Sequence, residues 1–196
     1  MNGSTHTAAG LACGLTAAAF LMPETLTLPG VVMGSGAAII ASTLPDCDQY
    51  ETHMNQGFQC IVKLVVFCFL VQWLTGTPVD WQYAFFFVIG IFVGAMTEHR
   101  SATHSVAALL IFTWLFSTMA GNHQELTLWF FVAYASHMVL DILNKRGEML
   151  LWPLSKERFC LKLSKSEGKL GKLIFRVAGI WYLMLLGWVV ISGSLI

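Results

Sequence analysis

Seven apolar runs divide the chain, and they constrain its fold more strongly than any other feature of the sequence. The first six contain 15 or 16 residues and the last contains 19, with prolines, glycines or charged residues between them. None of the runs alternates apolar with polar residues, so each predicts a helix rather than a strand of a transmembrane barrel. The runs are Thr7–Met22, Gly30–Leu44, Cys60–Thr75, Trp81–Met96, Ser105–Ala120, Leu126–Asp141 and Leu173–Ile191.

Composition places these helices in a membrane. Hydrophobic residues make up 56% of the 196 residues and charged residues only 11%, against roughly 25% charged residues in soluble domains. Helices are favoured because backbone polar groups in lipid must be satisfied within their own segment. Six runs are shorter than the roughly 20 residues that span a bilayer, so we expect the helices to extend into their flanks or to end below the interface. The sequence therefore predicts an all-α, polytopic transmembrane bundle of about seven helices, forming a single domain over residues 1–196.

Basic residues are distributed asymmetrically along the chain. If all seven runs cross, the connections alternate between two sides, and all eleven lysines and arginines lie in or beside connections of one side. Cytoplasmic connections carry such an excess, so we expect the N-terminus to be cytoplasmic. Residues 142–172 form the longest of these connections, a basic cytoplasmic loop before the last helix. Its segment 155–172 mixes Phe and Leu with lysines, and is either an ordinary loop or a segment lying on anionic headgroups.

The connection at residues 98–105 gathers several ionisable groups between two apolar runs. Glu98, His99, Arg100 and His104 all lie there. Polar groups this close to hydrocarbon are costly and usually functional. The ordinary alternative is a solvated loop with a serine or threonine as the cap of the next helix. His99 and His104 are five positions apart, so we expect one to leave a helix and the other to enter the next.

The same side of the predicted bundle carries further imidazoles and carboxylates. His137 and Asp141 are four positions apart, so they lie on one face of a helix. Asp46 and Asp48 follow a helix-stopping proline, where alternate residues of an extended turn share a side. His6 lies where the first helix begins. Each feature alone has an ordinary explanation, either turn chemistry or a helix end that meets water.

Taken together, these residues predict a metal site at one membrane face. Imidazole and carboxylate ligands suit zinc best here, with manganese or iron as alternatives. The supply exceeds the four ligands of one structural zinc, so we expect an open catalytic site with one or two ions. Arg100 is predicted to grip a phosphate, and Glu98 or Glu51 to act as a general base or to support a ligand. The predicted ligands are His6, Asp46, Asp48, His99, His104, His137 and Asp141.

At these residues the chain resembles the membrane-bound metal-dependent hydrolases, including the LexA-regulated inner-membrane hydrolases. The resemblance covers about residues 1–158, and no single element carries it. That family usually has a glycine after His-Arg, where this chain has Ser101. The resemblance implies a metal-dependent hydrolase in the bacterial inner (cytoplasmic) membrane. Its elements are His6, Leu44-Pro45-Asp46-Cys47-Asp48, His99-Arg100 with Thr103-His104-Ser105, Ser136-His137 with Asp141, and Gly147 followed by Leu151-Trp152-Pro153.

The functional expectation is hydrolysis of a phosphoester, such as a phospholipid or a lipid-linked phosphate, at the cytoplasmic membrane face. A metal-binding membrane protein or metal transporter without hydrolase activity is the alternative, although the apolar middles of the runs argue against conduction. A haem protein fits the neighbouring aspartates poorly, and an intramembrane metalloprotease would need an HExxH motif, which does not occur. The expected partners are the lipid bilayer and the substrate, with no nucleic acid. The sequence does not indicate an oligomeric state.

Overall fold

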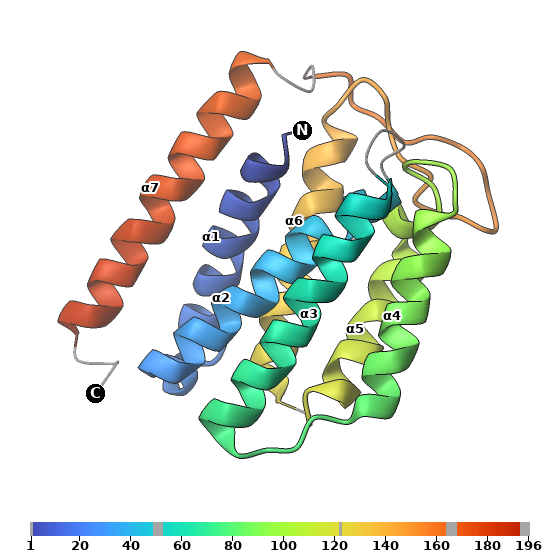
Figure 1. The fold of residues 1–196 in the computed structure, drawn as a ribbon. Coiled ribbons are helices and arrows are strands. Elements are labelled where there is room, and N and C mark those ends of the chain that lie inside the picture. Colours follow the sequence, from blue (N-terminus) through green and yellow to red (C-terminus); the bar gives the residue numbers. More distant parts are fainter. Residues whose placement is uncertain (1, 49–52, 122, 164–167, 193–196) are drawn as a thin grey trace.

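The computed structural model of the protein describes residues 2–48, 53–121, 123–163 and 168–192. Within these residues the fold is all-helical, with seven α-helices and no strand (Figure 1). The predicted all-α class and helix number are therefore confirmed. The α-helices are α1 (Gly3–Leu21), α2 (Leu28–Thr43), α3 (His53–Thr75), α4 (Trp81–Ala95), α5 (Val106–Met119), α6 (Gln124–Ile142) and α7 (Lys169–Ile191), and the short 3-10 helices are η1 (Pro23–Thr25), η2 (Pro45–Asp48) and η3 (Ala102–His104).

Side-chain caps mark the starts of three helices. The hydroxyl of Thr27 accepts a hydrogen bond from Gly30 N at the start of α2, where a proline also lies in the first turn. Asp80 caps α4 in the same way, and Ser105 caps α5. These caps satisfy backbone N–H groups that have no partner within the helix. Of the three caps, Ser105 lies in the connection between α4 and α5 and fixes where α5 begins.

The core of the bundle forms where α6 packs against α1 and α2. Trp129 of α6 is 2% exposed and lies over Gly14 of α1 and Gly34 of α2. A Cβ atom at these two glycines would come within 2.5 and 2.4 Å of the Trp129 ring. Small residues let helices approach closely where lipid provides no hydrophobic drive for association. α1, α2 and α6 are therefore held tightly together.

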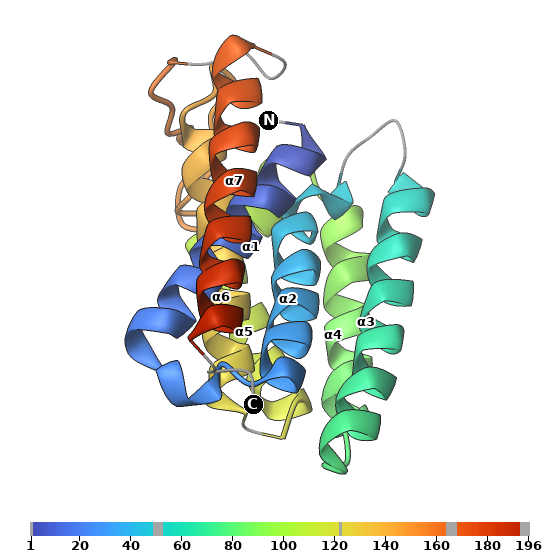
Figure 2. The ribbon, with the colours of Figure 1, turned by 90° about the vertical axis from the view of Figure 1, so that its left-hand side faces the viewer.

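The remaining helices surround this core. α3 packs against α2 and α4, and α5 packs against α4 and α6. α7 packs along α1, on one flank of the bundle (Figure 2). Two hydrogen bonds tie α7 to its neighbours, from Trp181 Nε1 to Thr16 Oγ1 at 2.9 Å and between Tyr182 and Ser35 at 2.9 Å. Most of the α7 surface stays exposed and apolar, as expected of a helix in contact with lipid.

Three segments are long and apolar enough to cross a membrane, namely Leu28–Asp48, Gly57–Thr75 and Lys169–Ile191. α4 and α5 are apolar but contain only 15 and 14 residues, short against the roughly 20 that span a bilayer. α4 and α5 are therefore short helices, as the sequence predicts.

The N-terminus, the connection between α4 and α5, and the connection between α6 and α7 lie at the same end of the bundle, which we call the site end (Figure 1). The described part of the α6–α7 connection folds back over the α4–α5 connection. Met149 N donates to Arg100 O at 3.1 Å, and Val106 N donates to Leu150 O at 3.0 Å. This part of the predicted basic loop therefore covers the site end. Which side of the membrane the site end faces stays a prediction.

Candidate metal centre

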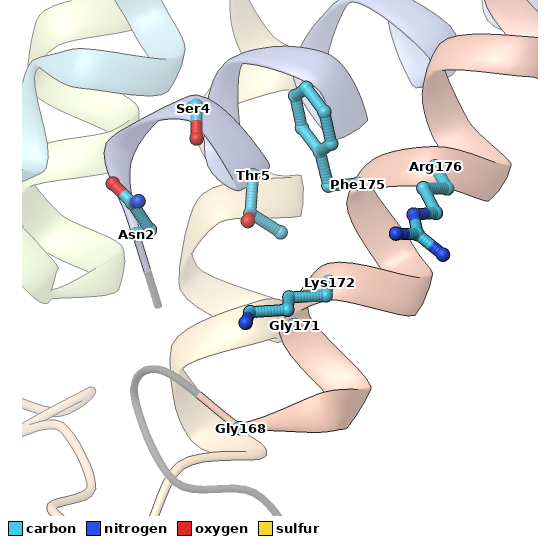
Figure 3. Close-up of a pocket in the computed structure, with 8 residues that line it drawn as sticks. All are labelled: Asn2, Ser4, Thr5, Gly168, Gly171, Lys172, Phe175 and Arg176. Atoms are coloured by element: carbon cyan, nitrogen blue, oxygen red, sulfur yellow. The ribbon is translucent and has the colours of Figure 1, made fainter.

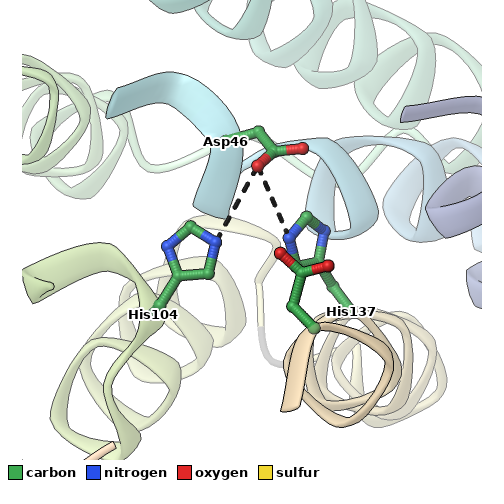
Figure 4. Close-up of side chains that lie close together, drawn as sticks. Asp46, His104 and His137 are labelled. Carbon is green, nitrogen blue, oxygen red and sulfur yellow. Dashed lines mark ion pairs between the residues drawn. The ribbon is translucent and has the colours of Figure 1, made fainter. Parts of the chain in front are cut away.

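Four of the predicted ligands converge at the site end. One ligand atom each from Asp46, His104, His137 and Asp141 lies within 4.8 Å of the other three. Asp46 Oδ1 lies 3.8 Å from His104 Nε2 and 3.7 Å from His137 Nε2 (Figure 4). These separations are too long for hydrogen bonds. They suit ligand atoms that surround a common ion, because each would bond to it at about 2.0–2.2 Å.

Three separate parts of the fold supply these side chains. Pro45 follows α2 and begins η2, which carries Asp46. His104 ends η3, immediately before Ser105 caps α5. His137 and Asp141 lie one turn apart near the end of α6, as their spacing predicts. Close packing of α2 and α6 through Trp129 brings the first and third of these parts together.

The ring of His137 is oriented by the backbone of α2. Its Nδ1 lies 2.8 Å from the carbonyl oxygen of Ser42. A carbonyl oxygen only accepts hydrogen bonds, so Nδ1 carries the proton and Nε2 carries the lone pair. His137 is fully buried, and Nε2 has no hydrogen-bond partner among the described residues. The lone pair is therefore directed toward Asp46, ready to bind a cation.

The ring of His104 is oriented by the pair Thr103 and Asp48. The Thr103 hydroxyl donates its only proton to Asp48 Oδ2 at 2.8 Å. Its oxygen lies 3.2 Å from His104 Nδ1, so it must accept the hydrogen bond from that nitrogen. His104 Nε2 then carries the lone pair. Both imidazoles consequently present an unprotonated nitrogen to the same small space.

Asp48 and His99 lie behind His104 and outside the four-residue cluster. Asp48 is fully buried, and its Oδ2 also accepts from Arg100 N at 3.0 Å. Its Oδ1 lies 2.7 Å from His99 Nδ1. Carboxylates that hydrogen-bond to the far side of a ligating histidine fix the orientation of the ring. The structure thus places Asp48 and His99 as supports of a ligand.

His6 and Arg100 contact the cluster through Asp141. His6 Nε2 lies 3.2 Å from Asp141 Oδ1, and the His6 ring stacks on His137 at 3.8 Å. Arg100 Nη2 lies 2.6 Å from Asp141 Oδ2. The Nε and Nη1 groups of Arg100 are buried and have no hydrogen-bond partner among the described residues. The Nε and Nη1 groups of Arg100 are therefore available to donate hydrogen bonds beside the predicted ligands.

Glu148 is a site residue that the sequence reasoning missed. It is fully buried, and its Oε1 lies 3.8 Å from His104 Nε2. Backbone hydrogen bonds with Phe159 hold it there, from Glu148 N at 3.1 Å and to Glu148 O at 2.9 Å. Burial raises the pKa of Glu148 to about 9, and the charge of Asp141 adds to this shift. The available signal was a further carboxylate in a site-end connection, directly after Gly147.

Two other predicted residues lie elsewhere. The Glu98 side chain is 68% exposed and pairs with Arg158 at 2.6 Å. It lies on the outer surface of the connection, away from the four-residue cluster. Glu51 falls outside the described residues. The two remaining polar residues of the loop are structural, since Ser101 donates to the Glu98 carbonyl and Ser105 caps α5.

The charge balance of the centre favours a bound cation. Among the described residues, the carboxylates of Asp46, Asp48 and Asp141 face one guanidinium, that of Arg100, whereas the raised pKa keeps Glu148 protonated when no metal is bound. Uncompensated buried charges are costly. A divalent ion is often the largest charge in such a site and would offset the excess negative charge. The two neutral imidazoles and two carboxylates of the cluster match the ligands that zinc, manganese or iron accept.

A small pocket reaches the centre at Asp46. It has a volume of about 110 Å³ and is lined by Thr43, Asp46, Gln59, Cys60, Lys63 and Gly3. The Asp46 side chain is 16% exposed, whereas those of His104, His137 and Asp141 are fully buried. Lys63 lies beside this opening and donates to Thr43 Oγ1 at 3.3 Å. A molecule from outside can therefore approach the cluster only past Asp46, as far as the described residues show.

The sequence profile of the family described as YdjM inner membrane protein matches residues 1–195. The chain belongs to the YdjM inner membrane protein family. Together with helices that are apolar enough to span a bilayer, this places the chain in the inner membrane. No curated protein and no solved structure matches it significantly. The family description gives a location and names no reaction. The candidate metal centre is therefore the feature of this YdjM family member that indicates its chemistry.

Proposed function

We propose that this chain is a membrane-embedded, metal-dependent hydrolase. Its substrate would be a phosphoester, such as a phospholipid or a lipid-linked phosphate. The observation that carries the proposal is the convergence of Asp46, His104, His137 and Asp141, with both imidazole lone pairs directed inward. A metal with a purely structural role would not require further polar groups beside its ligands. Here the carboxyl group of Glu148 and the guanidinium of Arg100 both have buried polar atoms without a hydrogen-bond partner among the described residues.

The four clustered ligands would allow a bound cation to activate water as the attacking group. A divalent cation held by Asp46, His104, His137 and Asp141 would lower the pKa of a bound water from 15.7 toward about 7. Glu148 lies beside His104 Nε2 and has no hydrogen-bond partner among the described residues. A cation bound at the cluster would lower the raised pKa of Glu148, and its carboxylate would then be placed to accept a proton there. Glu148 thus takes the general-base role that the sequence analysis gave to Glu98 or Glu51.

The guanidinium of Arg100 supports a phosphoester as the substrate. Its Nη2 is held by Asp141, which fixes the plane of the guanidinium. Nε and Nη1 remain as two buried donors beside the ligands. Arginine donors in a fixed plane match two oxygens of a phosphate and stabilise charge that develops on it. The phosphate of the substrate would therefore lie between Arg100 and the cation.

The entrance favours a substrate anchored in the membrane. The pocket at Asp46 has room for a headgroup phosphate, since 110 Å³ equals only a few water volumes of about 30 Å³ each. The rest of a lipid would stay in the bilayer. Lys63 lies at the opening and would attract an anionic group. The excess of basic residues at the site end favours the cytoplasmic face.

Metal analysis of the purified protein tests the proposal, alongside hydrolysis of a phosphodiester, a phosphomonoester and a phospholipid. We expect His137→Ala and Asp46→Ala to lose bound metal and hydrolysis together. His123→Ala is the matched control, because His123 pairs with Glu125 at the opposite end of the bundle. Unchanged metal content in both ligand variants would overturn the metal centre. Metal loss without hydrolysis of any phosphoester by the parent protein would favour a metal-binding or transport role instead.

A further inference from the structure

A second polar pocket lies at the site end, between the N-terminal turns of α1 and α7. Its volume is about 500 Å³ (Figure 3). Thr5 and His6 are neighbours on α1, yet Thr5 lines this pocket while His6 contacts Asp141 in the metal centre. The pocket therefore lies on a different face of α1 from that centre. Its principal side chains are Asn2, Ser4 and Thr5 from the start of α1, and Lys172, Phe175 and Arg176 from α7.

Among the described residues that line this pocket, the only charged side chains are basic. Lys172 and Arg176 are four positions apart, so both project from one face of α7. Neither side chain forms an ion pair or a hydrogen bond with another described residue. Two uncompensated cations beside one cavity would repel each other. A bound anion would remove this repulsion.

Both helices also direct their N-terminal ends toward the pocket. Neither Asn2, at the start of α1, nor Gly168, at the start of α7, forms a capping hydrogen bond through a side chain. Neither helix has an acidic residue in its first turn. The first N–H groups of a helix have no acceptor within the helix, and the helix dipole favours negative charge there. These backbone donors add to the two cations.

Thr5 supplies an independent indication of a ligand. It is 3% exposed, yet its hydroxyl has no hydrogen bond to any described residue. Its side chain projects from α1 into the pocket (Figure 3). The Thr5 oxygen is not one of the fully buried atoms that lack a partner, so it is accessible from the pocket and can donate to a ligand there. An acceptor oxygen in the pocket would satisfy it.

We propose that this pocket binds the phosphate of an anionic phospholipid. The site would lie at the headgroup level, because α7 is a candidate membrane span that begins here. The volume exceeds that of the pocket at Asp46, and Phe175 gives it an apolar wall. Phosphate oxygens would accept from Thr5, Lys172, Arg176 and the N-terminal backbone of α1. The lipid would join α7 to α1, the helix on which α7 mainly packs.

Binding to the purified full-length chain in a neutral detergent tests this assignment. The probes are short-chain phosphatidylglycerol, short-chain phosphatidylcholine and inorganic phosphate, with the rise in melting temperature as the readout. We expect phosphatidylglycerol to stabilise the protein more than phosphatidylcholine. Lys172→Gln with Arg176→Gln should weaken that effect roughly tenfold or more. Lys156→Gln with Lys169→Gln removes the same charge outside the pocket and should have little effect.

A third variant separates loss of the site from loss of folding. Ser4→Asp places a carboxylate in the pocket at the second residue of α1, where negative charge stabilises a helix. We expect it to abolish the lipid effect without lowering the melting temperature of the lipid-free protein. Metal content should stay unchanged in all these variants, so the result is independent of the proposed hydrolase activity. Equal effects of the two double variants, or an undiminished effect in Ser4→Asp, would overturn the site. Equal stabilisation by inorganic phosphate would overturn the lipid and leave a free-phosphate site.

Discussion

The hydroxyl of Thr103 donates a 2.8 Å hydrogen bond to Oδ2 of Asp48. This contact joins the end of α2 to the α4–α5 connection, and it fixes which nitrogen of His104 is protonated. Tyr134 reinforces it by donating to the Thr103 carbonyl at 2.5 Å. The orientation of a ligand on one loop thus depends on a carboxylate from another part of the fold.

Asp48→Asn should weaken metal binding without removing a ligand. An amide replaces one acceptor oxygen of the carboxylate by an NH2 group that only donates, so the contacts to Thr103, His99 and Arg100 N cannot all persist. Loss of such a supporting partner typically lowers metal affinity about 10- to 100-fold. Titration against a competing chelator measures the change. Asp80→Asn is the control, since Asp80 caps α4 away from the cluster and asparagine also caps. Equal affinities of the two variants would contradict the role assigned to Asp48.

Glu148 should make the metal-free protein less stable as the pH rises. Its pKa is raised from 4.5 to about 9, so the folded chain keeps a proton that the unfolded chain releases between these values. The folded state then binds more protons than the unfolded state, and stability falls through this interval. Glu148→Gln removes the titration and should flatten the fall. Melting temperatures of chelator-treated protein from about pH 5 to about pH 9 measure it. Parallel profiles of the two proteins would contradict the prediction.

The fold could be predicted because lipid leaves few alternatives. Each apolar run must satisfy its own backbone. Pro45 follows the end of α2 as predicted, and α4 begins at Trp81, where the predicted run begins. The helix boundaries could be predicted less accurately from the sequence. α3 begins at His53, well before the predicted run at Cys60, so the helix extends into the polar segment that precedes this run in the sequence.

The site was predictable only as a set of residues. The sequence could show that Asp46 and Asp48 share a turn, but their roles depend on which of them faces His137 on α6. Glu148 lies in a connection without helical periodicity, and its burial follows from backbone contacts with Phe159 that no local pattern encodes. The carboxylate of Glu98 could serve as a base, but its side chain points to the outer surface, where it pairs with Arg158. The direction in which a side chain points depends on tertiary contacts, which the sequence alone does not show.

Gly34→Ala should destabilise the bundle and reduce metal binding with it. The new Cβ would meet the Trp129 ring at 2.4 Å, so α2 would have to move away from α6. Overpacking of this kind costs about 1–3 kcal/mol. Because Asp46 follows α2 and His137 lies on α6, the same movement would separate two ligands. Gly179→Ala on α7 is the matched control, since its Cβ would have nothing within 4 Å. Thermal unfolding and metal content of the two variants test the prediction, which equal melting temperatures would contradict.

Arg100 combines a functional side chain with an unfavourable backbone. Its φ is +67°, in the left-handed region that side chains with a Cβ rarely adopt. The next residue, Ser101, has a φ of −110°, so the left-handed position falls on the arginine itself. Retaining a guanidinium at such a position indicates that its contact with Asp141 outweighs the strain.

Arg100→Gly and Arg100→Ala separate these two effects. Both variants lose the ion pair with Asp141 and the two donors at Nε and Nη1, so both should lose hydrolysis and destabilise the buried Asp141. Only alanine keeps the backbone strain. We therefore expect Arg100→Gly to be more stable than Arg100→Ala by about 1 kcal/mol. Unfolding in mixed micelles with increasing denaturing detergent measures the difference. If alanine is as stable as glycine, the left-handed backbone at Arg100 carries no strain, and the guanidinium alone explains the cost of both changes.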